Sequence, residues 1–446
     1  MRMGLFIVLA VVPLGKTAFA DVRPEVRVEE DVYDVVSPDN GSGPLWSYGC
    51  TVIARSGEDV VISQMKTGID VPRLCNTRWR LLRREGGAWK CFAEAEGYRQ
   101  REPCPLCILP GGRLYLNVND STQPSGTMYG ATDPHLLLFR LGAAPGPGER
   151  ISPQWRGDYS FSDHSYRGYA ADPEREQLLV FNINNKTGVQ YWGLLTADGK
   201  TLSGGEVAFP IRSCYPQVAL KRGAGYILAV GDIVEPVEEW RKYKFEQTQR
   251  EWDYVFRILY FAWTAAAAQA GFSKPLEIAN VDATAGYIGN QDLWVAPNGD
   301  AYIVYTQLEV QSALLRDKFF PGKSVLPSFR LAVVRNGELS DRQVLIEESE
   351  ERQVGCARFH ETPSGEVYAV LYVAGTEPGN KLMRIYPTVE TRDLISIPLR
   401  QPFTSFCLAG ERAGNRPSNT IDFVGHRGSG DKISYGQIVL TDVTNP

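Results

Sequence analysis

The chain alternates between polar turns and short apolar runs of strand length. Turns that contain Gly, Pro or charged residues lead into apolar or aromatic runs, most clearly in LPGGRLYLNV, APNGDAYIVY and TPSGEVYAVL. Weaker copies of this unit are ARSGEDVVIS, DPEREQLLVF, KRGAGYILAV and SNTIDFVGHR. Because units of this kind indicate β-hairpins, the pattern predicts an all-β chain.

The spacing of these units indicates a repeat. One hydrophobic residue of each unit serves as a marker, and the seven markers are Val60, Tyr115, Leu178, Tyr226, Tyr302, Tyr368 and Phe423. Neighbouring markers lie 48 to 76 residues apart, with a mean of about 60. A period of this length built from hairpins is typical of four-stranded sheets in a radial array, so we predict a seven-bladed β-propeller.

A radial array also solves a burial problem. A single four-stranded sheet cannot hide both of its apolar faces, whereas blades around an axis cover each other and leave only short edges. A pair of β-sandwich domains is the alternative, but no Pro/Ser-rich linker interrupts the chain. We therefore expect residues 21–446 to form one propeller domain.

The longest interval, between Tyr226 and Tyr302, contains EPVEEWRKYKFEQTQREWDYVFRILYFAW. Its charge and its helix-forming residues predict an insertion with a helix near residues 235–249 and a strand over 254–263. Insertions in propellers emerge on a rim, so we expect this segment to contribute to a substrate groove.

The N-terminus has the features of an export signal. Arg2 precedes the apolar run Gly4–Gly15, and Ala18-Phe19-Ala20 supplies a small-x-small cleavage site. We predict a signal peptide over residues 1–20 and a secreted or periplasmic protein. The apolar run is only about half of the roughly 20 residues that cross a bilayer. The remaining 426 residues carry a formal charge of −7, which argues against nucleic acid as a partner.

The eight cysteines of an exported protein usually form disulfides, which here would be auxiliary because the chain is long enough to bury a core. One set of residues suggests a metal instead. Cys356, His360, Cys407 and His426 offer two thiolates and two imidazoles, a combination that suits tetrahedral structural zinc. We predict such a site, with a Cys356–Cys407 disulfide as the alternative.

Two further histidines and one arginine are candidates for chemistry. His164 lies in the polar, aromatic run SDHSYRGY just before a strand, where an imidazole could accept a proton near neutral pH or instead tie a blade turn together. His135 begins an apolar strand, which favours a structural role. Arg212 lies near aromatic residues and could hold a carboxylate with two hydrogen bonds, or join two blades through a salt bridge.

At these residues the chain resembles the BNR-repeat-type propeller proteins that include the ulvan-degrading polysaccharide lyases. The stretches that carry the resemblance run from about residue 103 to 427 and include DHSYRGYAAD, PIRSCYPQVALK, GDIVEPVEEWR, EWDYVFRILYFAW, ARFHETPSGEVYAVLYV and RAGNRPSNTIDFVGHR. The resemblance implies a seven-bladed propeller in which a histidine and a tyrosine transfer protons and an arginine neutralises a uronate. It also implies a structural zinc.

Carried over by local match, His164 is the predicted base, Tyr191 the proton donor and Arg212 the carboxylate clamp, with Tyr166, Tyr169 and Tyr215 as rivals of Tyr191. The predicted substrate-binding residues are His135, Arg167, Tyr215 and Tyr254. The expected activity is β-elimination on an acidic polysaccharide by a monomer that needs no organic cofactor and no membrane partner.

Two other functions fit the same architecture. A sialidase-like hydrolase would need two opposed carboxyl groups, for which Asp158, Asp163, Asp253 and Asp292 are available, and several arginines around one carboxylate. A non-catalytic propeller could bind glycans through its aromatic residues, although these also suit blade cores. Fold alone does not separate the three functions.

Overall fold

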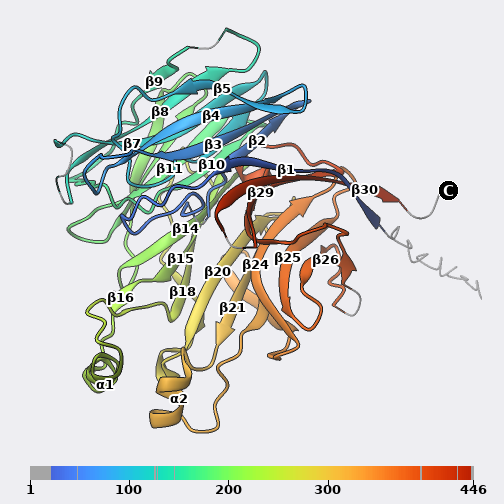
Figure 1. The fold of residues 1–446 in the computed structure, drawn as a ribbon. Coiled ribbons are helices and arrows are strands. Elements are labelled where there is room, and N and C mark those ends of the chain that lie inside the picture. Colours follow the sequence, from blue (N-terminus) through green and yellow to red (C-terminus); the bar gives the residue numbers. More distant parts are fainter. Residues whose placement is uncertain are drawn as a thin grey trace, which may run out of the picture.

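A computed structural model describes residues 22–442 except 48, 125–126, 128, 145, 392–393 and 429. Within these residues the strands form seven four-stranded antiparallel sheets and one two-stranded hairpin. The sheets are the blades of a seven-bladed β-propeller, as predicted (Figure 1). The predicted signal peptide lies outside the described residues, and export therefore stays a prediction.

Blades 1 to 3 follow one another along the chain. Blade 1 consists of β2 (Ile53–Ser56), β3 (Asp59–Thr67), β4 (Thr77–Glu85) and β5 (Ala88–Glu94). Blade 2 consists of β6 (Leu106–Leu109), β7 (Arg113–Ser121), β8 (Thr132–Arg140) and β9 (Glu149–Ile151). Blade 3 consists of β10 (Gly168–Asp172), β11 (Gln177–Ile183), β12 (Gln190–Thr196) and β13 (Thr201–Val207).

Blades 4 to 6 continue in the same order. Blade 4 consists of β14 (Ser213–Lys221), β15 (Ala224–Gly231), β18 (Ile258–Thr264) and β19 (Leu276–Asn280). Blade 5 consists of β20 (Tyr287–Val295), β21 (Ala301–Leu308), β22 (Ser328–Arg335) and β23 (Glu338–Ile346). Blade 6 consists of β24 (Arg352–Glu361), β25 (Val367–Gly375), β26 (Gly379–Tyr386) and β27 (Ile395–Ser396).

Blade 7 closes the ring with strands from both ends of the described chain. It contains β28 (Phe403–Leu408), β29 (Thr420–Arg427) and β30 (Lys432–Asp442), and its outer strand is β1 (Val22–Asp34). β1 pairs antiparallel with β30 from Val22 opposite Asp442 to Asp34 opposite Lys432, and the two strands lie side by side in Figure 1. Closure by hydrogen bonds leaves the ring without an open edge between its first and last blades.

The seven markers of the sequence repeat all lie on second strands, from Val60 on β3 to Phe423 on β29. Each of the seven blade interfaces has its own buried apolar cluster. Tyr115 and Leu178, for example, meet between blades 2 and 3, and Ile62 and Tyr435 meet between blades 7 and 1. The apolar faces are therefore covered by neighbouring blades, which is the burial that the repeat predicted.

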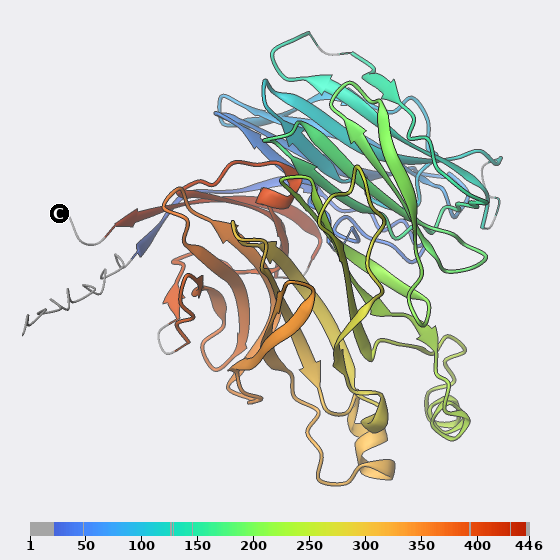
Figure 2. The same ribbon diagram turned by 180° about the vertical axis from the view of Figure 1, so that it is seen from behind.

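Two α-helices project from the same side of the ring (Figures 1 and 2). α1 (Glu238–Thr248) confirms the helix predicted near residues 235–249, and the hairpin of β16 (Ile233–Val234) and β17 (Tyr254–Val255) forms its base. The strand predicted over 254–263 is divided between β17 and β18. α2 (Ala313–Phe319), which was not predicted, packs against Trp240 of α1 through Phe319. No helix in the described ranges has the length and apolar character to span a membrane.

Candidate active site

The candidate residues lie on the face of the ring where the first strand of every blade begins, here called the entry face. Arg167 and Arg212 directly precede β10 and β14, Tyr215 is the third residue of β14, and His164 lies four residues before β10. Tyr191 and His135 lie near the starts of the third strands β12 and β8, which run parallel to the first strands. Tyr254, on β17, belongs to the insertion on the same face.

His164 is the centre of a polar and aromatic cluster. Its Nε2 lies 2.5 Å from the Tyr166 hydroxyl, and its Nδ1 lies 2.9 Å from Oε1 of Glu102. The imidazole also packs against the indole of Trp46, with 5.2 Å between ring centroids. The side chain of His164 is 24% exposed, so a ligand on the entry face can reach it.

Glu102 determines how the imidazole is protonated. Its buried carboxylate accepts bonds from the backbone N–H and the hydroxyl of Ser165. Burial alone would raise the pKa of Glu102, but His164, Arg167 and Ser165 together hold it below its ordinary value. An ionised Glu102 can only accept, so Nδ1 of His164 donates to it, and Nε2 is the acceptor for the Tyr166 hydroxyl.

Tyr166 joins His164 to Arg212. The guanidinium carbon of Arg212 lies 5.2 Å from the centre of the Tyr166 ring and 5.9 Å from that of Tyr254. Arg212 is a third exposed and pairs with Asp232 at 2.7 Å. Burial, reinforced by the charge of Asp232, raises the pKa of the Tyr166 phenol, which therefore stays protonated at neutral pH.

The backbone is strained at the two tyrosines that start blades 3 and 4. Tyr166 has φ = 42° and Tyr215 has φ = 54°, a region that residues with bulky side chains rarely adopt. Their rings contact each other edge-on at 4.8 Å. Strain of this kind persists where the surroundings hold it and is concentrated at functional sites.

The structure does not bring Tyr191 into this cluster. Tyr191 is buried, donates to the Asp158 carbonyl at 3.2 Å, and packs against Tyr159 and Phe161. The tyrosine in contact with His164 is Tyr166, one of the rivals named from the sequence. His164 and Arg212 do share the same side of the molecule, as the elimination hypothesis requires.

His135 and Arg167 occupy structural positions rather than exposed substrate positions. His135 is buried, and its Nδ1 lies 2.8 Å from the Asp133 carbonyl. The buried Arg167 guanidinium donates to the carbonyls of Asn117 and Pro103, which ties blade 3 to blade 2. The other two predicted substrate residues, Tyr215 and Tyr254, do lie in the cluster with Tyr166 and Arg212.

The four predicted zinc ligands do not converge. His360 bonds the Ser418 carbonyl through Nε2 at 2.7 Å, and Nδ1 of His426 lies 3.2 Å from the Lys432 carbonyl. In the described part of the chain, no group of three or more His, Cys, Asp or Glu side chains is arranged to hold a metal ion. All eight cysteines are described and all are free, so the Cys356–Cys407 disulfide is not formed either.

The aspartates predicted for a hydrolase are mostly paired with cations. Asp163 pairs with Arg101 at 3.0 Å, Asp253 with Lys244 at 2.7 Å, and Asp292 with Arg412. Each of these pairs lies in a different part of the ring. These three aspartates are therefore engaged in ion pairs rather than presented as free carboxyl groups.

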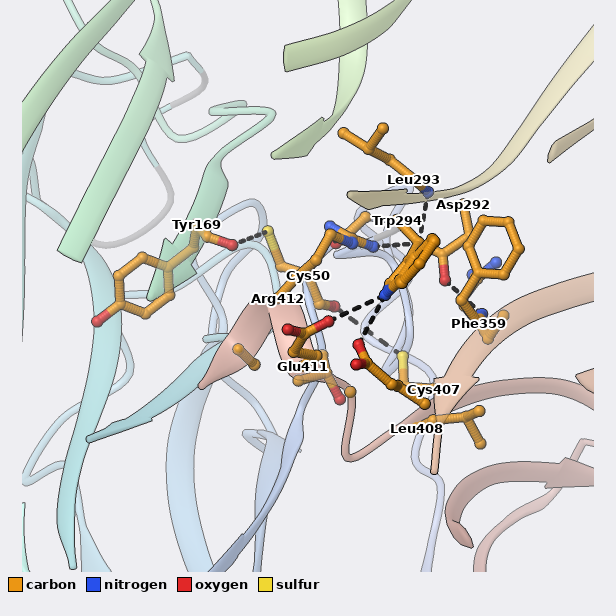
Figure 3. Close-up of a pocket in the computed structure, with 16 residues that line it drawn as sticks. Cys50, Tyr169, Asp292, Leu293, Trp294, Phe359, Cys407, Leu408, Glu411 and Arg412 are labelled. Carbon is orange, nitrogen blue, oxygen red and sulfur yellow. Dashed lines mark hydrogen bonds and ion pairs between the residues drawn. The ribbon is translucent and has the colours of Figure 1, made fainter. Parts of the chain in front are cut away.

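The central channel is closed by the segment between β28 and β29. Its 3-10 helix η2 (Glu411–Ala413) inserts Arg412, which pairs with Asp292 (Figure 3). Arg412 also donates to the carbonyls of Gly49 and Val218 and to Gln217. The remaining cavity is about 50 Å³, far below the several hundred Å³ of a typical ligand pocket. A larger cavity of about 380 Å³ lies on the opposite face, away from His164.

Sequence reasoning missed Glu102, Trp46 and Asp232. Glu102 lies four residues before β6, as His164 lies four residues before β10. Equivalent positions of adjacent blades are neighbours in a propeller, so a precise blade register would have paired these two residues. The repeat markers placed strands too coarsely for that comparison.

No protein-family model and no curated protein matches the sequence. Solved structures match its fold. One is described as the polysaccharide lyase Uly1, with 10% identity and a TM-score of 0.50, covering 94% of this chain and 98% of the other.

Two structures are described as a PL25 ulvan lyase, one of them bound to -[GlcA(1-4)Rha3S]-. They have 9% and 8% identity, a TM-score of 0.56, and cover 93% of this chain and 95% of the other. An α-L-arabinanase from Penicillium chrysogenum has 12% identity and a TM-score of 0.45, covering 94% and 99%. Likeness at such identities establishes the propeller fold, whereas membership of the BNR-repeat family stays a prediction.

Proposed function

We propose that the chain is an exported polysaccharide lyase that cleaves a uronate-containing polysaccharide by β-elimination. The observation that carries the proposal is His164, held between Glu102 and Tyr166 on the entry face, with Arg212 against the Tyr166 ring. The likeness to a propeller lyase whose structure contains a glucuronate-bearing sugar supports this choice of substrate class.

Arg212 has the first role in the proposed reaction. The proton next to a uronate carboxylate is removed only when the charge of that carboxylate is offset, because the carbanion that forms is otherwise too unstable. The Arg212 guanidinium is exposed enough to bind the carboxylate while Asp232 fixes its position. This interaction strengthens as negative charge develops.

His164 and Tyr166 then divide the proton transfers. With substrate bound, the Tyr166 O–H turns from Nε2 of His164 to the glycosidic oxygen, which frees the Nε2 lone pair. Nε2 then removes the proton, the carbon–carbon double bond forms, and the bond from the neighbouring carbon to the glycosidic oxygen breaks. Tyr166 donates its proton to that leaving oxygen. The imidazolium, whose charge Glu102 offsets, returns the acquired proton to the phenolate across the 2.5 Å contact, and the pair is restored.

The test is an assay on ulvan and other uronate-rich polysaccharides that records both ultraviolet absorbance of unsaturated uronate and new reducing ends. A lyase raises both signals, a hydrolase raises only reducing ends, and a binding protein raises neither. His164→Ala and Tyr166→Phe should each lower the rate roughly 10²- to 10⁴-fold, whereas Tyr191→Phe should leave it nearly unchanged. Full activity of His164→Ala would exclude the proposed base.

A further inference from the structure

Two pairs of stacked aromatic rings flank the cluster of His164, Tyr166 and Arg212. The first, the blade-4 platform, consists of Trp252 and Tyr254, whose rings are 22° from parallel with centroids 6.5 Å apart. The second, the blade-3 platform, consists of Tyr159 and Phe161, at 20° and 5.1 Å. Both rings of the blade-4 platform are exposed, whereas in the blade-3 platform Tyr159 is exposed and Phe161 is buried. Both platforms lie on the entry face.

Trp252 is the more exposed of the outer rings, with 74% of its surface accessible. The backbone next to it is nevertheless held in place. The backbone N–H of Glu235 donates to the carbonyl of Asp253, the residue after Trp252, and Lys244 pairs with the Asp253 carboxylate at 2.7 Å. Glu235 is in turn bound by the buried Arg257. A large apolar ring that is exposed to solvent on a fixed segment of backbone is more typical of a ligand contact than of core packing.

The blade-4 platform continues directly from the proposed carboxylate clamp. Arg212 contacts Tyr254 at 5.9 Å, and Tyr254 contacts Trp252. Trp252 is therefore at the outer end of a row of contacts that begins at Arg212.

The blade-3 platform belongs to the segment that leads to His164. Phe161 is three residues before His164, and Tyr159, which is 46% exposed, covers it. The turn before β12 lies next to both Arg212 and the blade-3 platform, because a Cβ added at Gly188 would lie 3.2 Å from Cγ of Arg212, and Asn184 donates to the carbonyl of Asp158.

We infer that Trp252 and Tyr159 are sugar-stacking subsites on opposite sides of the cleavage point. The C–H face of a pyranose packs on an aromatic ring through hydrophobic and dispersion contacts, which tolerate different hydroxyl patterns. Two platforms with the reacting groups between them select an extended polymer that crosses the entry face, so cleavage occurs within the chain. This inference rests on the proposed function and adds the mode of substrate binding.

The experiment compares Trp252→Ala, Trp252→Phe and Tyr159→Ala with the wild type, and Phe245→Ala, another exposed aromatic residue of the insertion, is the matched control. Affinity electrophoresis in gels that contain ulvan or another uronate-rich polysaccharide measures binding without catalysis. We expect each alanine variant at Trp252 or Tyr159 to bind about 3- to 10-fold more weakly, with Trp252→Phe and Phe245→Ala close to the wild type.

Kinetics on long polymer and on short oligosaccharides separate binding from chemistry. We expect Trp252→Ala to raise KM for the polymer by a similar factor with little change in kcat, and to leave the shortest cleaved oligosaccharides unaffected. Product sizes should fall across the whole distribution early in the reaction, as cleavage within the chain requires.

The outcomes distinguish this inference from the proposed function. If the protein is a lyase but the Trp252 and Tyr159 variants bind and cleave polymer like the wild type, the stacking subsites are wrong and the proposed function stands. If these variants bind more weakly but the wild type forms no unsaturated product, the subsites stand and the lyase proposal fails. If the wild type neither binds nor cleaves any of these polysaccharides, both are wrong.

Discussion

Glu411 in the closed channel gives a stability prediction that does not depend on the proposed activity. Its carboxylate lies 3.0 Å from Nε1 of Trp294 (Figure 3). It also lies 2.8 Å from Nζ of Lys221, and the same indole nitrogen is 2.8 Å from the carboxylate of Glu361. Burial, reinforced by Glu361, raises the pKa of Glu411 from 4.5 to about 7, although Lys221 opposes the shift. The two carboxyl groups thus share the channel most easily when Glu411 is protonated.

The shift converts into a free energy of unfolding. Between pH 4.5 and about 7 the folded protein retains a proton that the unfolded chain has released, so stability falls as pH rises. At 1.36 kcal/mol per pKa unit, a shift of this size corresponds to about 3 kcal/mol. This contribution is fully present below pH 4.5 and is lost once the pH exceeds the folded-state pKa.

Glu411→Gln removes the titration and retains the shape of the side chain. Urea unfolding, followed by near-ultraviolet circular dichroism at pH values from 4.5 to about 8, should show the variant gaining about 3 kcal/mol relative to the wild type over this range. The control is Glu174→Gln, at an exposed carboxyl group on the same side of the ring. Its free energy of unfolding should change with pH in the same way as that of the wild type. Parallel curves for Glu411→Gln would refute the argument.

Three further predictions concern other residues. Burial lowers the pKa of His360 from 6.5 to about 4, so the wild type should lose about 3 kcal/mol of stability as pH falls through that interval. His360→Gln should not show this loss in the same urea series. Glu102→Gln should lower lyase turnover roughly 10²-fold and alter its pH profile, because the amide no longer fixes the proton on Nδ1 of His164, and an unchanged profile would contradict that role. Gly414→Ala should lower the urea midpoint, because φ is +85° there and an added Cβ would lie 1.9 Å from the Ile108 carbonyl oxygen; an unchanged midpoint would contradict this packing.

The blade count and the helix of the insertion could be predicted from local pattern. Each marker, such as Val60 or Phe423, lies on a strand that must be apolar because two neighbouring blades bury it, and that requirement is visible in the sequence. α2 was not predicted because its seven residues carry only a short helical pattern. The residue that it packs against, Trp240, is more than seventy positions away in the sequence, so no local pattern indicates the contact.

The site residues were harder to predict because their contacts join different blades. His164 and Arg212 were chosen by residue type and neighbouring aromatics, and these features do place them together. Tyr191 was chosen on the same grounds and lies apart, since its position on β12 turns it towards Phe161. His360 offered the residue type of a zinc ligand, but its imidazole is satisfied by the Ser418 carbonyl in the adjacent blade.

The position of the site follows from how a propeller is closed. Arg412 fills the channel by bonding blades 1, 4 and 5 at once, so the axis is closed between the two faces, and the proposed site lies on the entry face. On the entry face, the segments before consecutive first strands come together, and this places Glu102 of one blade against His164 of the next. Arg212 then enters from the following blade. A reaction that needs a base, a proton donor and a carboxylate clamp can therefore be assembled from three short segments, each held by a different sheet, and a polymer can reach them without entering a pocket.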